Sequence, residues 1–392
     1  NSGCWSGSSI VIDNTLYLVY TGFALHEDGK YYQTINIAYS KDGVNFDKYA
    51  LNPIIDTKDI PSCASIYDFR DPCIFKKNGK LYIIVGSKSK DEKEAMLVLY
   101  EGEDIFHFHF LKKLVSSDKF GTMFECPNLV SFEDNNYIIM SPQNIKEKDG
   151  NFANVSSCVY FKLKGDFIHE EQTIEKVKEI DHGLEYYAPT VYNDEKILVN
   201  WVQMWGRRYY LDEIHNDFIN TFSLFKKIKE KNSVLSFTPL SLENYVTEKK
   251  IEKIKLNGES QTYHNCHVHY QVKFEKDEEL CLTLEFFDSK RDKVNFVIDC
   301  KNNIYQLDRS NVSIPLNGVE DSYAKDGKRY LKKEIPSNCV IDIYIDNAYV
   351  EIYFDNFEEG FSFINFSKED GFRLKSNKLV EISLLSENIE VK

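Results

Sequence analysis

Short apolar segments alternate with polar turns throughout residues 1–201. The turns are rich in Asn, Asp or Gly, and such a turn between two apolar strands is typical of a β-hairpin. Residues 35–40 and 44–46 flank Lys41-Asp42-Gly43 and also predict a hairpin. Four further hairpins are expected at 10–12 with 16–20, 74–75 with 81–85, 129–132 with 137–140, and 191–192 with 197–201.

A short polar motif precedes each of these four hairpins. The motifs are Trp5-Ser6-Gly7, Arg70-Asp71-Pro72, Glu125-Cys126-Pro127 and Tyr187-Ala188-Pro189, and they recur at steps of 65, 55 and 62 residues. A repeat of several strands near this length predicts the blades of a β-propeller, with a non-repeating β-sandwich as the alternative. Equivalent positions of a propeller surround one axis, so Asp71, Glu125 and Tyr187 are expected to converge at one mouth of its channel.

The blade motifs stop near residue 250, and plain alternation of apolar and polar residues replaces them. Residues 341–345 and 350–354 alternate in this way, which is typical of half-buried strands in an antiparallel sandwich. We therefore expect an all-β chain, with a propeller domain over 1–245 and a β-sandwich domain over 250–392.

Charge and composition narrow the classes of partner. The 392 residues include 48 Lys and Arg against 62 Asp and Glu, so the formal net charge is −14. Binding to nucleic acids or anionic membranes depends on basic patches, so neither partner is expected. No apolar run approaches the length of a membrane span. The 27 Phe and 25 Tyr favour strands.

The nine cysteines show no Cys-x-x-Cys spacing. This pattern argues against a structural zinc site and a disulfide framework, and indicates free thiols in a reducing, cytoplasmic compartment. His264, Cys266, His267 and His269 are close in sequence, but His267 and His269 alternate with Val268 and Tyr270 along an apparent strand, so no metal site is predicted. No glycine-rich phosphate-binding motif occurs, so no cofactor is expected.

Two carboxylates, Asp71 and Glu125, stand at what we take as the same position of adjacent blades. Asp71 follows Arg70, which predicts a carboxylate held ionised by a cation, whereas Glu125 follows apolar residues, which predicts a raised pKa. Carboxyl groups with separated pKa values are typical of glycoside hydrolysis. The alternatives are a solvated turn residue for Asp71 and an exposed strand-end residue for Glu125.

Three aromatic residues, Trp5, Tyr187 and Trp205, are candidates for stacking against a sugar ring. Core packing is the alternative for each of them, and Trp201 stands four residues before Trp205.

The motifs resemble those of a known family. Cys4-Trp5-Ser6-Gly7-Ser8, Asp68-Phe69-Arg70-Asp71-Pro72, Phe124-Glu125-Cys126-Pro127 and Tyr186-Tyr187-Ala188-Pro189 occur in this order. Together they resemble glycoside hydrolase family 32, which contains invertases, sucrose-6-phosphate hydrolases, levanases and inulinases. Leu307-Asp308-Arg309-Ser310 and Val350-Glu351-Ile352-Tyr353 look like motifs of the family's C-terminal sandwich.

This resemblance implies a five-bladed propeller followed by a β-sandwich, and hydrolysis of β-fructofuranosides with retention. Glu125 matches the family's general acid/base, and Asp71 matches the carboxylate that binds fructosyl hydroxyls and stabilises the transition state. The positions that match substrate-contacting residues are Trp5, Ser6, Arg70 and Trp205.

Two departures from the family pattern change these expectations. Asn128 follows Glu125-Cys126-Pro127 where the family usually has Asp, which is expected to alter the pKa of the acid/base. The family's nucleophile lies in a Trp-x-Asn-Asp-Pro-Asn-Gly motif, which does not occur in these 392 residues. We therefore expect a propeller without its first blade, and little or no hydrolysis by the chain as written.

Two other functional classes stay open: an inverting glycosidase on a related five-bladed propeller, and a non-catalytic glycan-binding protein. The predicted partner is a sugar or fructan, and sucrose, sucrose 6-phosphate and fructans all remain candidates. The cysteine usage leans towards the cytoplasmic substrate, sucrose 6-phosphate. No pattern indicates the oligomeric state.

Overall fold

The computed structural model describes residues 2–25, 27, 29–207, 220–264, 267–287, 292–312, 327–365 and 371–390. Regular structure in these ranges is β, apart from two 3-10 helices, η1 (Thr57–Asp59) and η2 (Glu243–Tyr245). No helix within them is long and apolar enough to cross a membrane.

The chain divides into two compact units, which are described separately. Unit 1 comprises Asn1–Lys146, Ser156–Lys178 and Ala188–Lys196, and unit 2 comprises Glu147–Val155, Glu179–Tyr187 and Ile197–Lys392.

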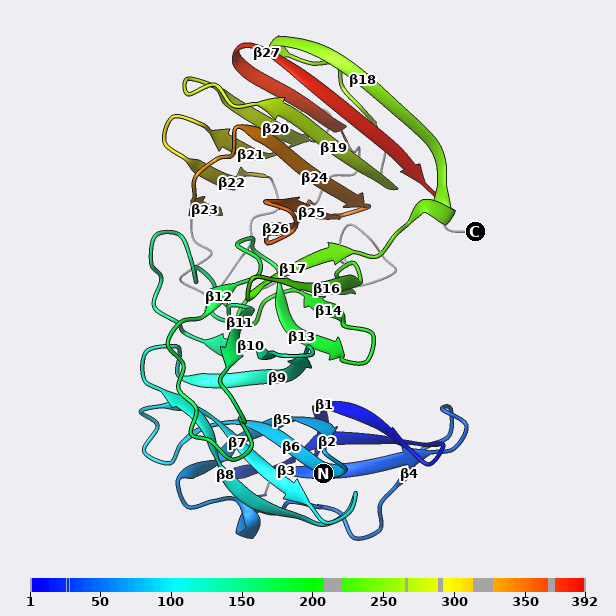
Figure 1. Cartoon of the computed structure of the whole chain (residues 1–392), viewed down its shortest axis with the longest axis vertical. Helices are drawn as coiled ribbons and strands as arrows, with labels where there is room; N and C mark the ends of the chain where they lie inside the picture. The colour runs from blue at the N-terminus through cyan, green and yellow to red at the C-terminus, as the bar shows by residue number, and fades with distance from the viewer. Residues whose placement is uncertain are drawn as a thin grey trace. The chain divides into compact units, whose positions relative to one another are not determined.

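Four antiparallel sheets follow one another along the chain in the order of propeller blades (Figure 1). The first contains β1 (Gly3–Ile12), β2 (Thr15–Leu25), β3 (Tyr31–Ser40) and β4 (Asp47–Lys48). The second contains β5 (Ala64–Lys77), β6 (Lys80–Ser89), β7 (Ala95–Gly102) and β8 (Phe108–Ser117). The third contains β9 (Met123–Ser131), β10 (Asn136–Gln143), β11 (Val159–Leu163) and β12 (Lys178–Glu179). The fourth contains β13 (Tyr187–Tyr192), β14 (Ile197–Val202), β15 (Thr221–Phe222), β16 (Lys226–Lys231) and β17 (Val234–Pro239).

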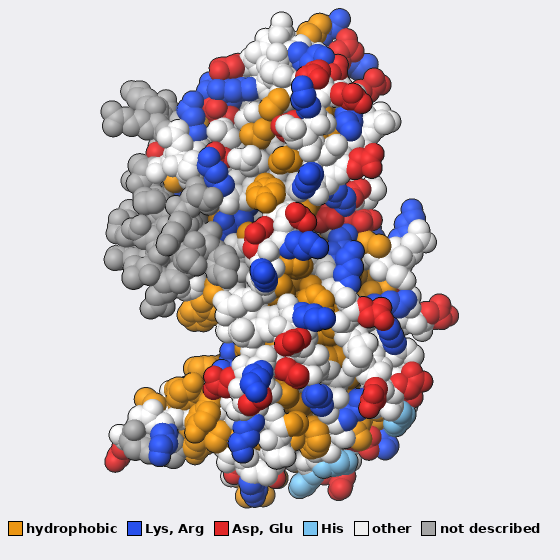
Figure 2. Space-filling view, turned by 90° about the vertical axis from the view of Figure 1, so that its left-hand side faces the viewer, with side chains coloured by type: hydrophobic (Ala, Val, Ile, Leu, Met, Phe, Trp, Pro, Cys, Tyr) orange, Lys and Arg blue, Asp and Glu red, His pale blue; other side chains and the backbone are white. Residues whose placement is uncertain are grey.

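The all-β class and a propeller-like arrangement are thus confirmed for four blades. A fifth blade is not among the sheets of the described residues. On the described part of the face in Figure 2, basic and acidic side chains are intermingled over the surface.

The predicted hairpins form where the turn residues allow a tight reversal. Asp13 and Asn14 have φ values of 48° and 59°, and Asn78 and Gly79 have φ values of 52° and 82°. Two successive residues with positive φ form the hairpin turn that matches the twist of the strands. The β1–β2 and β5–β6 hairpins are therefore confirmed, together with β9–β10 and the predicted position of β13 and β14.

The hairpin predicted after residues 35–40 forms, because β3 pairs antiparallel with β4, but the predicted position of its second strand is wrong: residues 44–46 are a loop, and β4 begins only at Asp47. The Asp42 carboxylate accepts hydrogen bonds from the amides of Val44 and Asn45, at 2.9 and 2.8 Å. A side chain that captures these amides withdraws them from a strand ladder.

The first strands of three blades are bulged at their polar motifs. The pairing register shifts between Trp5 and Gly7 in β1, and between Arg70 and Cys73 in β5. It also shifts after Glu125 in β9. Bulges of this kind re-aim side chains next to functional sites.

The central motif residue before each proline has a left-handed backbone. Asp71, Cys126 and Ala188 have φ values of 61°, 49° and 50°. Residues before proline normally adopt extended conformations, and a non-glycine residue with positive φ costs about 1–3 kcal/mol. Such a conformation persists only where neighbouring groups hold it.

Each of these three residues donates its amide to a side chain of the preceding blade. The Asp71 amide donates to Thr21 Oγ1 at 2.8 Å, and the Cys126 amide donates to Asp71 Oδ2 at 2.9 Å. The Ala188 amide donates to Ser141 Oγ at 3.2 Å. These three contacts, which all lie within unit 1, join one blade to the next at the motif.

A second set of hydrogen bonds between blades is made by the side chain that stands two residues after the central motif residue, Ser8 in β1 and Asn128 in β9. Ser8 Oγ donates to the Pro72 carbonyl at 2.7 Å and accepts from the Ile74 amide at 2.8 Å. The Asn128 side chain makes the same two kinds of bond to the backbone of β13, at 2.8 and 3.0 Å. Asn128, which was expected to alter the pKa of the acid/base, therefore joins two blades.

The C-terminal strands form one curled, ten-stranded antiparallel sheet within unit 2 (Figure 1). Its strands are β18 (Val246–Glu259), β19 (His267–Glu275), β20 (Cys281–Phe287), β21 (Lys293–Asp299), β22 (Ile304–Asn311), β23 (Lys328–Lys332), β24 (Asn338–Asp346), β25 (Tyr349–Phe354), β26 (Glu359–Ile364) and β27 (Gly371–Ile389). The sandwich is not confirmed, because the 19-residue β27 joins the strands into one sheet. Its first part pairs with β20, its last part pairs with β19, and β18 runs along its other edge.

The prediction that β25 is half-buried is wrong, because all six of its residues are buried. The polar face of β25 contacts β16 of the same unit, where Lys226 Nζ lies 2.9 Å from Glu351 Oε2. Both side chains are about 1% exposed. A buried charge is tolerated when a partner of opposite charge is present.

A second buried ion-pair cluster in unit 2 surrounds His182. Its Nε2 lies 2.9 Å from Glu359 Oε2, and its Nδ1 lies 3.3 Å from Glu179 Oε2. Although burial alone would lower the pKa of His182, the two carboxylates raise it to about 10. The protonated imidazole therefore contributes to the stability of unit 2.

Removing the Thr21 hydroxyl tests the contacts between blades. Thr21 is fully buried, so Thr21→Val leaves the Asp71 amide without its acceptor in a site of unchanged shape. The free energy of unfolding is expected to fall by about 1–3 kcal/mol in urea denaturation. Thr21→Ser retains the hydroxyl, so its free energy of unfolding is expected to fall by less than half of the decrease in Thr21→Val. Equal losses in both variants would contradict the role of the hydroxyl.

The His182 cluster predicts a specific pH dependence of stability. Because the folded pKa lies above the ordinary value of 6.5, the stabilisation is complete below pH 6.5 and is lost as pH rises through about 10. The difference in free energy of unfolding between wild type and His182→Gln is therefore expected to shrink from pH 7 to 10. His169→Gln, which replaces an exposed histidine, provides the control. A constant difference for His182→Gln would contradict the prediction.

Candidate active site

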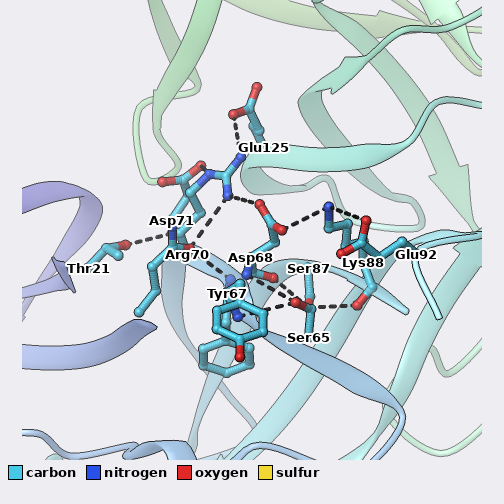
Figure 3. A network of polar contacts seen from close by, with 12 residues as sticks. Thr21, Ser65, Tyr67, Asp68, Arg70, Asp71, Ser87, Lys88, Glu92 and Glu125 are labelled. Atoms are coloured by element: carbon cyan, nitrogen blue, oxygen red, sulfur yellow. Dashed lines mark hydrogen bonds and ion pairs between the residues drawn. The ribbon is translucent and has the colours of Figure 1, made fainter. Parts of the chain in front are cut away.

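Arg70 of β5 is the centre of the polar network in unit 1 (Figure 3). Its Nη2 donates to Glu125 Oε1 of β9 at 2.8 Å, and its Nη1 donates to Asp68 Oδ1 at 3.0 Å. Its Nε lies 4.0 Å from Asp71 Oδ2, and Gln33 Oε1 of β3 lies 3.5 Å from Nη1. One guanidinium thus faces three carboxylates that come from two adjacent blades.

Burial governs the charges of this network. Although burial alone would lower the pKa of Arg70, the carboxylates of Glu125 and Asp71 raise it above its ordinary value. Burial raises the pKa of Asp71, although the Arg70 guanidinium and the Cys126 amide oppose this shift. Arg70 thus acts on Asp71 in the expected direction, but burial outweighs it, so the pKa of Asp71 is raised and not lowered. Arg70 and Asp71 are neighbours in sequence but not the closest ion pair, because the Arg70 guanidinium points towards Glu125 on the next blade.

Glu125 lies in a different setting from the one expected. It is 5% exposed and follows the buried Phe124, but its carboxylate forms an ion pair with Arg70. Its strand position is that of Arg70 rather than Asp71, since Glu125 pairs with Ser141 as Arg70 pairs with Gly86. The two carboxylates are thus one position apart in their blades, and the bulges bring them to the same guanidinium.

Gly86 of β6 allows the close approach of these two blades. A Cβ at this position would lie 2.2 Å from the Phe124 carbonyl oxygen. A side chain would therefore push β9, and with it Glu125, away from β5. The blades on either side have Thr21 and Ser141 at the corresponding positions.

Trp5 and Ser6 lie on β1, in the blade that precedes the blade of Arg70 along the chain. The Trp5 ring is 43% exposed and stacks on Phe23, with ring centroids 4.5 Å apart. Ser6 is exposed, and its carbonyl accepts a hydrogen bond from Thr21 Oγ1 at 3.0 Å. Thr21 therefore connects the Ser6 backbone to the Asp71 amide.

Tyr187 and Trp205 belong to unit 2. Tyr187 is 5% exposed and packs edge-on against Trp201, at 5.9 Å between ring centroids, which favours the core-packing alternative. Trp205 is 62% exposed and contacts Trp201 at 5.5 Å. The expected convergence therefore joins Asp71 and Glu125, while Tyr187 is described within the other unit.

Several residues of the network (Figure 3) were not among the site residues predicted from the sequence, including Thr21, Gln33, Asp68 and Lys88. A signal for Thr21 exists, because Thr21, Gly86 and Ser141 each stand fifteen residues after the central motif residue of their blade. Asp68 opens the motif Asp68-Phe69-Arg70-Asp71-Pro72. No local sequence pattern indicates its contact with Lys88 on β6, at 2.9 Å.

No group of three or more potential metal ligands occurs in the ranges that the structure describes. Cys266, one member of the histidine-rich segment, lies outside them. His269 contacts Asp342 and Glu387, at 2.9 and 2.8 Å.

A comparison with models of protein families gives a match over most of the propeller region. The model described as "Glycosyl hydrolases family 32 N-terminal domain" matches residues 1–239. Sucrose-6-phosphate hydrolase of Bacillus subtilis is 30% identical over 209 residues, covering 51% of this chain and 42% of that protein. Sucrose-6-phosphate hydrolase of Streptococcus mutans is 26% identical over 388 residues, covering 96% of this chain and 76% of that protein.

Solved structures share the fold. The Bombyx mori GH32 β-fructofuranosidase superposes with a TM-score of 0.84 and 24% identity, covering 99% of this chain and 79% of that chain. Sucrose-6-phosphate hydrolase from Lactobacillus gasseri gives a TM-score of 0.86 and 20% identity, covering 99% and 78%. Since the family model covers more than half of the sequence and includes Arg70, Asp71 and Glu125, the chain belongs to glycoside hydrolase family 32.

Proposed function

We propose that this protein hydrolyses β-D-fructofuranosides with retention, with Glu125 as general acid/base. The observation that carries the proposal is the convergence of Glu125 and Asp71 on Arg70, from two adjacent blades. Paired carboxyl groups in different environments are the usual machinery of glycoside hydrolysis.

Glu125 would protonate the glycosidic oxygen as the bond to the anomeric carbon breaks. After the leaving group departs, the same carboxylate would take a proton from water, which attacks the fructosyl intermediate. The Arg70 guanidinium holds this carboxylate in place through one charged hydrogen bond. The side chain is therefore already ordered before substrate arrives.

Asp71 would bind fructosyl hydroxyls while positive charge develops on the sugar. Its Oδ2 accepts the Cys126 amide, which fixes the orientation of the carboxyl group. A fixed carboxylate stabilises an oxocarbenium-like transition state more than a mobile one, because it needs no reorganisation. Trp5 and Ser6 on β1, and Trp205, are the further substrate-contacting positions in the proposal.

The nucleophile of a retaining reaction is assigned to an Asp in the family motif that these 392 residues do not contain. The proposed activity therefore concerns the form of the protein that supplies this motif. Sucrose 6-phosphate is the substrate that we propose first, because both relatives described above are named sucrose-6-phosphate hydrolase. Sucrose and fructans are the other candidates.

The proposed location is the cytoplasm. No disulfide joins any of the eight cysteines in the described ranges. Unpaired thiols are typical of a reducing compartment.

Replacing the acid/base tests the mechanism. In the hydrolysing form, Glu125→Gln is expected to lower kcat about 10²–10⁴-fold with sucrose or sucrose 6-phosphate. The loss should be smaller for an aryl fructoside whose phenolate departs without protonation. The control is Glu133→Gln in the exposed β9–β10 turn, which should keep wild-type kcat. Near-normal turnover by Glu125→Gln would remove its assigned role.

The product formed in methanol separates the alternatives. Methyl β-D-fructofuranoside indicates retention, whereas the α-anomer indicates the inverting glycosidase. Fructan binding without any turnover indicates the glycan-binding protein. Release of fructose by the 392-residue chain at ordinary enzymatic rates would contradict the expectation that hydrolysis needs an Asp from the missing motif.

A further inference from the structure

A carboxylate outside the proposed catalytic pair contacts the same guanidinium. Asp68 Oδ1 accepts from Arg70 Nη1 at 3.0 Å, while Glu125 Oε1 accepts from Arg70 Nη2 at 2.8 Å. Asp68 and Glu125 therefore divide the two terminal nitrogens of Arg70 between them. A guanidinium that contacted Glu125 alone could offer it both nitrogens in a bidentate pair.

Asp68 is itself paired with a second cation. Its Oδ2 lies 2.9 Å from Lys88 Nζ on β6, and Lys88 Nζ lies 3.5 Å from Glu92 Oε2 (Figure 3). Although partial burial alone would lower the pKa of Lys88, the carboxylates of Asp68 and Glu92 raise it. The result is a row of alternating charges, Glu92–Lys88–Asp68–Arg70–Glu125, which ends at the proposed acid/base.

The backbone around Asp68 holds this row in place. The Asp68 amide donates to Ser65 Oγ at 3.3 Å, and its carbonyl accepts from Ser87 Oγ at 2.8 Å. The next amide, that of Phe69, donates to Gln33 Oε1 at 2.8 Å. Exposure along the row rises outwards, since Arg70 is 11% exposed, Asp68 19% and Glu92 64%.

We propose that Asp68 is a positioning residue that shares the charge of Arg70 with Glu125, and that Lys88 sets how much of that charge Asp68 draws away. This inference rests on the proposed role of Glu125 and adds the residues that regulate it. An acid must hold its proton in the Michaelis complex, but an undivided Arg70 would hold Glu125 as the carboxylate. Asp68 reduces that effect, and Lys88 partly restores it.

The other charged groups described around Arg70 and Glu125 do not replace this row of charges. Asp71 lies on the Nε side of Arg70, at 4.0 Å, and the Cys126 thiol lies 3.6 Å from Asp71 Oδ2. Burial, Asp71 and Glu125 together raise the pKa of Cys126 well above its ordinary value, so this thiol stays neutral. Of these groups, Asp68 is the one that itself contacts a lysine.

Titration of Glu125 with and without the two outer residues tests the inference. The midpoint is followed by ¹³C NMR in the chain labelled at glutamate Cδ, and the Glu125 signal is identified by its loss in Glu125→Gln. Asp68→Asn is expected to lower the midpoint by about one pH unit. Lys88→Met is expected to raise it by about half a pH unit. A purely structural role would not produce shifts of opposite sign.

Three further variants serve as controls. The double variant Asp68→Asn/Lys88→Met should behave as Asp68→Asn, because Lys88 acts through Asp68. Asp68→Glu keeps the charge and should restore most of the wild-type midpoint. Glu92→Gln removes the exposed end of the row and should leave the midpoint unchanged. If Asp68→Asn does not fold, the sign of the Lys88→Met shift decides.

Unchanged midpoints in Asp68→Asn and Lys88→Met, or shifts of the same sign, would overturn the inference. In the hydrolysing form, the alkaline limb of kcat/KM is expected to move in the same directions as the midpoints. The two proposals fail separately. Shifted midpoints with full activity of Glu125→Gln would reject the acid/base role and retain the charge row, whereas an essential Glu125 with unshifted midpoints would reject the row alone.

Discussion

The hydrogen bonds made by the residue before each motif proline are the constraint on which the rest of unit 1 depends. Asp71, Cys126 and Ala188 all adopt positive φ, and each turns its amide towards the preceding blade. A buried amide without an acceptor costs about 1–3 kcal/mol, so each blade must offer one. Two blades use the hydroxyls of Thr21 and Ser141. Between them, the acceptor is the carboxylate of Asp71, because the corresponding residue of β6 is Gly86.

This exchange of a hydroxyl for a carboxylate links the fold to the proposed chemistry. Gly86 lets β9 approach β5, and the approach places Glu125 within 2.8 Å of Arg70. Once buried, the guanidinium needs anionic partners, since an unpaired buried charge costs several kcal/mol. Arginine suits this position better than lysine, because its planar fork can contact Asp68 and Glu125 through separate nitrogens. Blade packing and the carboxylate arrangement therefore have a common physical origin.

The sequence predicted the parts of this structure that local chemistry determines. Asp13-Asn14 and Asn78-Gly79 fix tight turns by themselves, so those hairpins and the repeat of motifs were predictable. The loop at 44–46 was not, because Asp42 captures backbone amides that the apolar pattern had assigned to a strand. The two-sided burial of β25 depends on Lys226, more than one hundred residues earlier in the chain. Asp71 and Glu125 were identified, but their partners depend on the register between blades, which no local pattern contains.

The same distinction explains why the expected partner of Arg70 and the expected environment of Glu125 differ from those in the structure. Arg70 adjoins Asp71 in sequence, yet its Nε is 4.0 Å from that carboxylate, whereas Glu125 is 55 residues away and lies 2.8 Å from Nη2. A general acid beside an arginine is chemically useful only if the cation orders the carboxyl group without keeping it ionised at working pH. Division of the guanidinium among several carboxylates meets both requirements. Asp68 and Glu125 each keep one directed hydrogen bond, while the positive charge that each of them experiences is reduced by the other carboxylates.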